Sequence, residues 1–240
     1  MSNLSNLKIE SYVALDLETT GINPSLDKII EIGMSKVIDG KEVASYKTLI
    51  NPDIHISARI TEITGITDSM VLDKPKISEI IKEILDFIGD LPLLGHNIIF
   101  DYSFLKKAAV NSNYTFEKQG IDTLKIARRL LPEVPHKSLE YLCDYFKLDK
   151  GSSHRAFDDA QSAIQLYCKL YEIKPDDEGF YNTIPLQFKI KKDVPATEAQ
   201  KRYLAALLDK HQLAIEEDIE KLTKSMASRM IDKIISEYGK

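Results

Sequence analysis

Two periodicities of hydrophobic residues divide the first 173 residues into strands and helices. Short apolar runs rich in β-branched residues predict strands at 12–17, 28–38, 42–50, 91–94 and 120–122. Apolar residues at helical spacing predict helices at 77–88, 98–110, 123–131, 138–146 and 156–171. Asp39-Gly40, between the second and third strands, is a strong signal for a tight hairpin. A meander followed by alternating helices and strands predicts an α/β fold with a mixed sheet flanked by helices.

The pattern changes near residue 174. Prolines and an Asp-Asp-Glu-Gly run predict a linker with one short strand at 186–190. Thr197-Glu-Ala-Gln200 then predicts a capping box that opens a helix to about residue 210, and a second helix is expected near 224–238. We therefore predict three parts, which are a main domain at 1–173, a linker at 174–196 and a small C-terminal helical hairpin at 197–240. Because so small a pair rarely stands alone, we expect it to pack on something.

Composition limits the class of protein. The longest apolar runs of the 240 residues are too short to span a bilayer, and the first eight residues lack the apolar core of a signal peptide. Cys143 and Cys168 lack metal-ligand spacing and fall on helical patterns, so each is expected to be a buried small hydrophobe. These features predict a soluble cytoplasmic protein without a membrane partner.

Acidic residues lie where predicted strands end and predicted helices begin. Asp16 and Glu18 end the first strand, and residues two apart on a strand point to the same face. Asp101 lies in the first turn of the helix at 98–110. Asp159 lies in the first turns of the helix at 156–171, and His154 comes just before it.

Each of these residues has an ordinary explanation when it is taken singly. Acids at the end of a strand can simply face solvent, and acids in the first turn of a helix are favoured by the helix dipole. A histidine near a helix start is more often incidental than catalytic. Four carboxylates brought together, however, repel one another unless a divalent cation offsets their charge. Two metals held by carboxylates beside a base form an arrangement that cleaves phosphodiesters.

Three blocks of residues resemble a known family. The blocks are Asp16-Leu-Glu-Thr-Thr-Gly-Ile-Asn-Pro24, His96-Asn-Ile-Ile-Phe-Asp-Tyr-Ser-Phe-Leu105 and His154-Arg-Ala-Phe-Asp-Asp159. Their order and spacing resemble the DEDDh 3′→5′ exonucleases, the family of the proofreading (epsilon) subunit and proofreading domains of bacterial replicative polymerases. Shorter matches lie at 29–33, 60–67 and 121–124. The resemblance covers residues 8–173 and implies a ribonuclease H-like fold for them.

The resemblance also implies a role for each residue. Asp16 would bridge two divalent cations, Mg²⁺ or Mn²⁺, while Glu18 and Asp159 complete the shell of the first and Asp101 holds the second. His154 would accept the proton of the attacking water, because imidazole titrates near neutrality. Contacts to the substrate would come from Thr19, Thr20, Gly21, Thr64, Ile66, His96 and Asn97.

The expected activity is metal-dependent release of nucleoside 5′-monophosphates from a single-stranded or mismatched DNA 3′ end, in proofreading or repair. One alternative is an RNA-trimming 3′→5′ exoribonuclease, because discrimination of the 2′-OH depends on pocket shape. Another is a non-catalytic module that docks on a DNA polymerase or other partner. Loss of catalytic residues would favour the docking module, but all five are present. Docking remains the leading idea for the C-terminal hairpin.

The net charge of −5 is unusual for a protein that binds nucleic acid. No long Lys or Arg tract predicts a groove for the phosphate backbone. Scattered basic residues could edge such a groove or could be ordinary solvated surface, namely Lys106, Lys107, Arg128, Arg129, Lys137, Lys150 and Arg155. We therefore expect brief, modest-affinity contact with a strand end.

Overall fold

The computed structural model describes residues 8–149, 151, 154–215 and 218–239. Its strands are β1 (Tyr12–Thr19), β2 (Ile29–Ile38), β3 (Lys41–Leu49), β4 (Leu93–Gly95), β5 (Lys118–Asp122) and β6 (Ile184–Leu186). Its helices are α1 (Ala58–Thr64), α2 (Asp68–Val71), α3 (Ile77–Ile88), α4 (Ile99–Asn111), α5 (Thr123–Leu130), α6 (Leu139–Phe146), α7 (Ala156–Ile173), α8 (Glu198–Lys210) and α9 (Lys224–Tyr238). Short 3-10 turns lie at η1 (Glu178–Phe180) and η2 (Ile219–Lys221).

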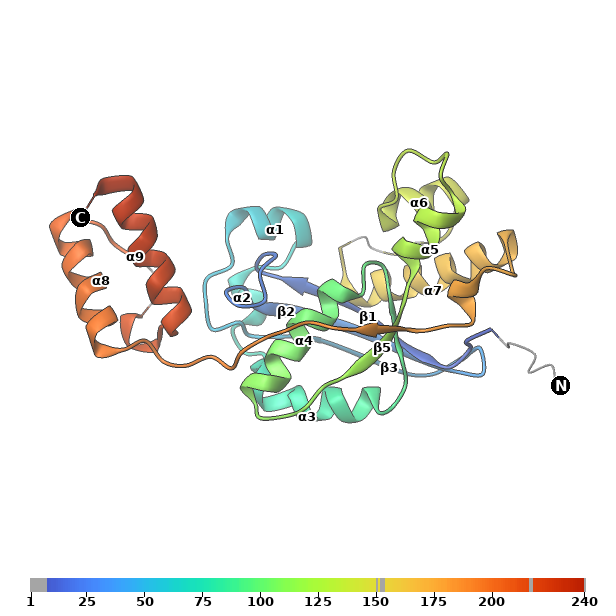
Figure 1. Ribbon diagram of the computed structural model, residues 1–240, viewed down its shortest axis with the longest axis horizontal. Coiled ribbons are helices and arrows are strands. Elements are labelled where there is room, and N and C mark those ends of the chain that lie inside the picture. The colour runs from blue at the N-terminus through green and yellow to red at the C-terminus, as the bar shows by residue number, and fades with distance from the viewer. Residues whose placement is uncertain (1–7, 150, 152–153, 216–217, 240) are drawn as a thin grey trace.

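The strands form one mixed sheet (Figure 1), whose order is β3-β2-β1-β4-β5-β6. β1 pairs antiparallel with β2 and parallel with β4, so it lies inside the sheet. The hairpin between β2 and β3 turns at Asp39 and Gly40, both of which have positive φ, as the sequence predicts. The short helices α1 and α2 were not predicted, because segments this short carry little periodicity.

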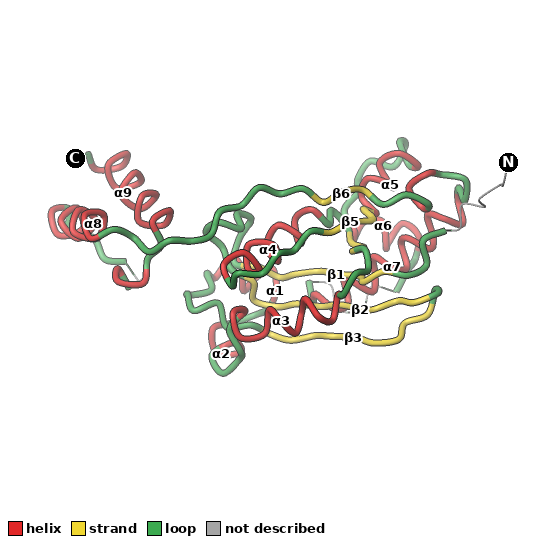
Figure 2. The backbone as a smooth tube through the Cα atoms, turned by 60° about the horizontal axis from the view of Figure 1, so that its bottom comes forward, coloured by secondary structure: helices red, strands yellow, loops and turns green. Residues whose placement is uncertain are grey.

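Helices cover both faces of the sheet (Figure 2). On one face, α3 and α4 pack against Val13, Leu15 and Leu17 of β1. On the other face, α5, α6 and α7 pack against residues that include Tyr12 and Ala14. Because Asp16 and Glu18 continue the second set, their side chains lie on the face that α7 covers. The predicted mixed sheet flanked by helices is therefore confirmed.

Residues 174–193 differ from the expected linker. Strand β6 lies at Ile184–Leu186 instead of 186–190, and it pairs antiparallel with β5 as the sixth strand of the sheet. Phe180 is fully buried in the core, and the Arg129 guanidinium forms an ion pair with the buried Asp177. Leu186 packs against Gly120, where a side chain would collide with it. Local composition did not reveal this segment because its burial depends on distant partners.

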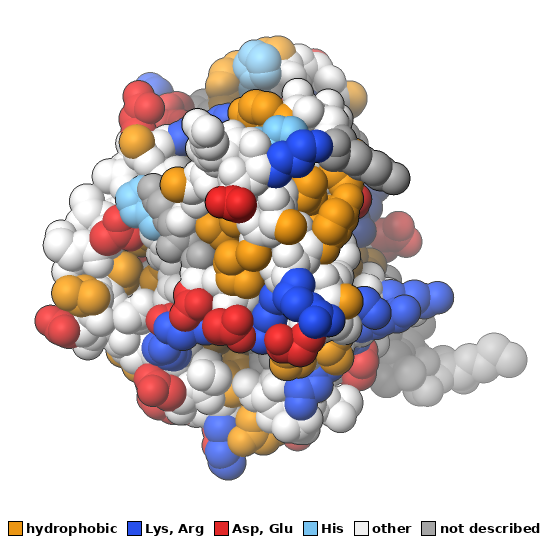
Figure 3. All heavy atoms as spheres, turned by 90° about the vertical axis from the view of Figure 1, so that its left-hand side faces the viewer, with side chains coloured by type: hydrophobic (Ala, Val, Ile, Leu, Met, Phe, Trp, Pro, Cys, Tyr) orange, Lys and Arg blue, Asp and Glu red, His pale blue; other side chains and the backbone are white. Residues whose placement is uncertain are grey.

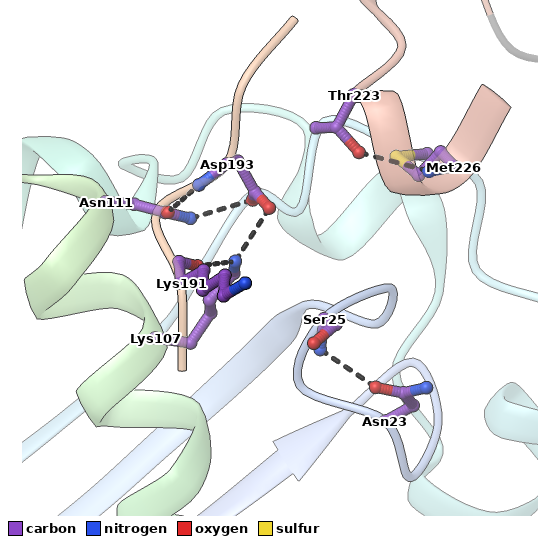
Figure 4. A network of polar contacts seen from close by, with 8 residues as sticks. All are labelled: Asn23, Ser25, Lys107, Asn111, Lys191, Asp193, Thr223 and Met226. Atoms are coloured by element: carbon purple, nitrogen blue, oxygen red, sulfur yellow. Dashed lines mark hydrogen bonds and ion pairs between the residues drawn. The ribbon is translucent and has the colours of Figure 1, made fainter. Parts of the chain in front are cut away.

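The chain leaves the main body at a polar anchor on α4 (Figure 4). The ammonium of Lys107 donates to the carboxylate of Asp193 at 2.7 Å and to the carbonyl of Lys191 at 2.7 Å. The amide of Asn111 donates to Asp193 at 2.9 Å, and its carbonyl accepts from the Asp193 backbone N–H at 2.9 Å. Lys107 and Asp193 are nearly buried, so this anchor fixes where the final segment begins.

Helices α8 and α9 form the predicted C-terminal hairpin and project from the rest of the chain (Figures 1 and 2). Thr197 and Gln200 make the predicted capping box at the start of α8. The apolar stripes pack against each other through residues such as Leu204, Leu207 and Ile231. A cleft of about 550 Å³ separates the pair from the main body, with Lys28 and Lys76 on one wall and Lys221 on the other.

The predictions for the two cysteines have different outcomes. Cys143 is buried as expected, whereas Cys168 is exposed on α7, so the prediction of a buried Cys168 was wrong. Within the ranges that the structure describes, every helix is too short or too polar to traverse a lipid bilayer.

Candidate active site

Strand β1 supplies two of the acidic residues. Asp16 lies opposite Gly33 of β2, and Glu18 lies opposite Glu31. Both side chains are half-buried on the face that α7 covers. The regularity of the pairing breaks between Glu18 and Thr19, so the acids stand where the ladder ends.

Asp101 reaches the same region from the first turn of α4. Strand β4 is short and pairs with β1 only at Val13 and Ala14, so it leaves the backbone of Leu17 without a strand partner on that side. The N–H of Leu17 instead donates to Asp101 Oδ1 at 3.0 Å. This hydrogen bond fixes the buried Asp101 carboxylate beside the end of β1.

The N-terminal end of α7 brings the remaining two residues. Asp159 is half-buried in the first turns, and its Oδ2 accepts from the His154 backbone N–H at 3.1 Å. His154 is exposed and has φ of 63°, a left-handed conformation that a residue with a side chain seldom adopts. One ligand atom from each of Glu18, His154 and Asp159 lies within 4.8 Å of the others. Three chain segments thus meet at one point.

The electrostatics of the site are those of a crowded acid cluster. Burial raises the pKa of Asp16 well above its usual value, and the charges of Asp101, Asp159 and Glu18 raise it further. Burial also raises the pKa of Asp101 well above its usual value, although the hydrogen bond from Leu17 opposes the rise. Burial and Asp159 raise the pKa of Glu18 to about 7, and burial raises that of Asp159 to about 6. The four predicted acids therefore act on one another.

This donor set suits a hard divalent cation. Carboxylate oxygens are the ligands that Mg²⁺ and Mn²⁺ prefer, and imidazole is a further ligand for transition metals. Burial and then the neighbouring acids raise the pKa values of these carboxylates, so their charged forms are disfavoured in the metal-free protein. A bound cation would supply that charge, so the residues present fit a metal site.

Sequence reasoning missed two residues that seat α7 on the sheet. Glu31 is buried, and its carboxylate accepts from Arg155 and from the backbone N–H of Ala156. Gly33 lies two residues along the same strand, where any side chain would collide with the backbone of Phe157. Both lie in the matching stretch at 29–33, so an acid and a glycine two apart on a buried strand were the available signal.

A family model described as an exonuclease, RNase T, matches residues 13–167. The chain belongs to this exonuclease family. It is 38% identical over 161 residues to a DNA polymerase III PolC-type protein of Caldanaerobacter subterraneus subsp. tengcongensis, a match that covers 67% of this chain and 12% of that protein. It is 31% identical over 237 residues to the PolC-type protein of Clostridium perfringens, which covers 95% of this chain and 16% of that protein. The chain thus spans less than a fifth of the length of these relatives.

Solved exonuclease structures share the fold. A structure of exonuclease X in complex with 5′ overhanging duplex DNA superposes with a TM-score of 0.56 at 29% identity, over 71% of this chain and 96% of that one. A complex of E. coli exonuclease I with single-stranded DNA gives a TM-score of 0.63 at 19% identity, over 70% of this chain and 41% of that one. The ribonuclease H-like fold that the motifs implied is confirmed.

The residues predicted to contact substrate lie in three places. Thr19, Thr20 and Gly21 follow β1, where the Thr19 hydroxyl donates to the Gly21 carbonyl at 2.6 Å and the Thr20 hydroxyl accepts from the Lys28 N–H at 2.9 Å. Thr64 and Ile66 are both buried around the end of α1. These contacts show how the two loops are held, and the role of these residues toward a nucleotide remains a proposal.

His96 and Asn97 lie in the loop between β4 and α4. The ring nitrogens of His96 lie 2.9 Å from the Thr123 hydroxyl and 2.6 Å from the Lys137 carbonyl, and burial lowers its pKa. The backbone N–H of Asn97 donates to the Asp122 carboxylate, and its φ is 72°. Both ring nitrogens of His96 therefore engage the protein, which ties this loop to α5 and to the start of α6.

Most of the scattered basic residues named above have acidic partners. Lys106 pairs with Glu117, Lys107 with Asp193, Arg129 with Asp177 and Arg155 with Glu31, while Lys150 lies outside the described residues. Acidic and basic side chains are also intermixed on the end of the molecule that carries α8 and α9 (Figure 3). The affinity of the chain for a strand end stays a prediction.

Proposed function

We propose that the protein is a metal-dependent exonuclease that removes nucleoside 5′-monophosphates from DNA 3′ ends. One observation carries the proposal, which is that ligand atoms of Glu18, His154 and Asp159 lie within 4.8 Å of one another, beside the half-buried Asp16. Two carboxylates and an imidazole converge there from two segments, the end of β1 and the start of α7. Membership of the exonuclease family supports this assignment of the cluster.

Mg²⁺ or Mn²⁺, two per site, would be held by Asp16, Glu18, Asp101 and Asp159. When bound, such metals activate water and stabilise the leaving oxygen of a phosphodiester. The strand β1 fixes Asp16 and Glu18, and the Leu17 N–H fixes Asp101. Asp159 holds the backbone of His154 by accepting its N–H, so the position of the histidine depends on that of the acid.

His154 is the residue proposed to accept the proton of the attacking water. Its side chain is exposed, so water and a strand end can reach it, while its backbone is held at Asp159. Imidazole is suited to proton transfer near neutral pH. The loop at Thr19–Gly21, which directly follows Glu18, is proposed to contact the terminal nucleotide.

Proofreading with a DNA polymerase is the proposed setting. The PolC-type relatives are DNA polymerase III proteins, and this chain aligns with a small part of each. An exonuclease for 3′ ends placed beside a polymerase would remove a mismatched terminal nucleotide. Co-purification or cross-linking with a replicative polymerase from the same cell would test this setting separately from the chemistry.

The test of the activity is a time course on three 5′-labelled substrates, which are a single strand of DNA, a duplex with a 3′ mismatch, and RNA of the same sequence. With Mg²⁺ or Mn²⁺ present, we expect a ladder of DNA products shortened from the 3′ end. With a chelator present, we expect no shortened products. Asp16→Asn is the inactive control. Shortening of RNA alone would replace DNA by RNA as the substrate, and no hydrolysis of any strand would refute the proposal.

A further inference from the structure

Strand β2 holds the start of α7 through Glu31. Arg155 Nε lies 3.1 Å from Glu31 Oε1 and 3.2 Å from Oε2, and Arg155 Nη2 lies 2.7 Å from Oε1. The backbone N–H of Ala156 donates to Oε2 at 3.2 Å. Both carboxylate oxygens therefore accept from the two residues at which α7 begins. The Glu31 side chain is 7% exposed, so water competes little for these bonds.

An acceptor from outside the helix is useful here because the N-cap residue of α7 does not cap the helix with its own side chain. Arg155 occupies the N-cap of α7, and its side chain accepts no backbone N–H. The first N–H groups of a helix have no partner within the helix, and a carboxylate near them is favoured by the dipole. Glu31 supplies that carboxylate from the neighbouring strand. Gly33, with no side chain, lets Phe157 approach the sheet closely enough for the contact.

The residues held by Glu31 lie between the two that α7 brings to the site. His154 directly precedes Arg155, and the Asp159 N–H donates to the Arg155 carbonyl at 3.0 Å in the first turn. Asp16 and Glu18 belong to β1, which pairs with β2. The bonds from Glu31 thus connect the strand ladder that fixes one half of the site to the helix start that carries the other half.

We propose that Glu31 and Arg155 form a positioning pair that sets His154 and Asp159 against Glu18. Neither residue of the pair needs to touch the strand or the reacting atoms. The inference rests on the proposed function, because the alignment it sets is that of the proposed base and metal ligands. The alternative is an ion pair that stabilises the fold and has no particular effect on the site.

The chain contains a matched pair that separates these two interpretations. Arg129 and Asp177 also form a two-point contact between a guanidinium and a buried carboxylate. Side-chain exposures are 42% and 8% for that pair, against 45% and 7% for Arg155 and Glu31. The control pair connects α5 to the segment before β6, and none of its contacts involves the acid cluster.

The experiment compares Glu31→Gln and Arg155→Lys with Asp177→Asn and Arg129→Lys in the full chain. We expect both positioning variants to lower kcat on a short single strand about 10- to 100-fold, with KM unchanged, as is typical when a partner of an active-site ligand is lost. The control variants should lower the melting temperature comparably and leave kcat unchanged. The double variant of Glu31 and Arg155 should lose little more kcat than either single variant, because the two act as a unit.

A second readout does not depend on activity. In the metal-free protein, the backbone amide resonance of His154 reports its hydrogen bond to Asp159. It should shift in Glu31→Gln and stay in place in Asp177→Asn. Unchanged kcat and an unchanged His154 amide in a folded Glu31→Gln protein would overturn the inference, as would an equal loss of kcat in Asp177→Asn. Failure of the wild-type chain to hydrolyse any strand would refute the proposed function, and the amide comparison would still decide whether the pair sets the position of His154.

Discussion

Glu18 and Glu31 are direct partners across the antiparallel pairing of β1 and β2, with both side chains on the face that α7 covers. Two like charges in this relationship destabilise a sheet. The fold treats them differently, because Arg155 forms an ion pair with Glu31, whereas burial and the nearby Asp159 raise the pKa of Glu18 to about 7. The strain of the acid cluster is therefore concentrated on the residues proposed to bind metal, which is the usual relation between stability and function at a site.

Removing one acid should stabilise the metal-free protein. The Asp16 carboxylate is destabilising because it is largely removed from water and lies among the charges of Asp101, Asp159 and Glu18. We expect Asp16→Asn to raise the melting temperature in the presence of a chelator by roughly 2–4 °C, on the order of 1 kcal/mol for a chain of this size. Hydrolysis should be lost. Asp73→Asn, on an exposed acid in the turn between α2 and α3, is the control, and a lower melting temperature for Asp16→Asn would contradict the account of repulsion.

The metal-free protein should lose stability as pH rises. Because the folded pKa values of Glu18 and Asp159 are raised to about 7 and about 6, the folded state binds more protons than the unfolded state between those values and about 4. The contribution of these groups is thus complete below about pH 4 and is lost as pH rises through 6 and then 7. Denaturant unfolding at a series of pH values with a chelator measures this. Mn²⁺ should reduce the loss of stability, and Glu18→Gln should flatten the stability curve near pH 7. A metal-free stability that rises between about pH 4 and pH 7 would contradict this prediction.

His154→Ala should separate proton transfer from metal binding. If the imidazole is the general base, the rate falls by about 10²–10⁴. Mn²⁺ affinity measured by calorimetry should remain, because the carboxylates supply the ligands. The control is His55→Ala, since that imidazole is also exposed and contacts Asp68 instead. Loss of Mn²⁺ binding together with activity would make His154 a metal ligand, consistent with its place in the 4.8 Å cluster.

Much of the fold and the core of the site could be predicted because their signals are local. A short stretch of sequence is enough to predict each of three features, which are the strand ending in Asp16 and Glu18, the helix at 77–88 and the capping box at Thr197. The meeting of Asp101 with β1 was an expectation from motif order. The reason for it, a β4 too short to pair with Leu17, needed the structure.

The features that escaped prediction depend on residues far apart in the chain. Glu31 and Arg155 are more than a hundred positions apart, and the sequence around each residue does not predict that the two will be in contact. Phe180 is in a segment with the composition of a loop, and it is buried because it packs against Tyr167 and Tyr171 of α7. Local propensity cannot report such burial, because tertiary packing decides it.

The final prediction concerns where the catalytic part of the chain ends. A chain ending after Val194 keeps β6, the Arg129–Asp177 pair and the Asp193 anchor, and it loses only the segment that carries α8 and α9. We expect it to fold and to hydrolyse a short single strand at nearly the full rate. A chain ending after Glu172 also loses the fully buried Phe180, a loss on the order of 3–5 kcal/mol by analogy with truncation of a core aromatic.

The two chains should therefore differ sharply in thermal unfolding and in soluble yield. Rates on short and long single strands then assign a role to the hairpin, whose helices bury their stripes mainly against each other. Loss of activity confined to long strands would place the hairpin in substrate or partner recruitment across the cleft that holds Lys28 and Lys221. A folded but inactive chain ending after Val194 would show that α8 and α9 help to form the active site. Equal stability of the two chains would show instead that β6 and Phe180 contribute little to the sheet.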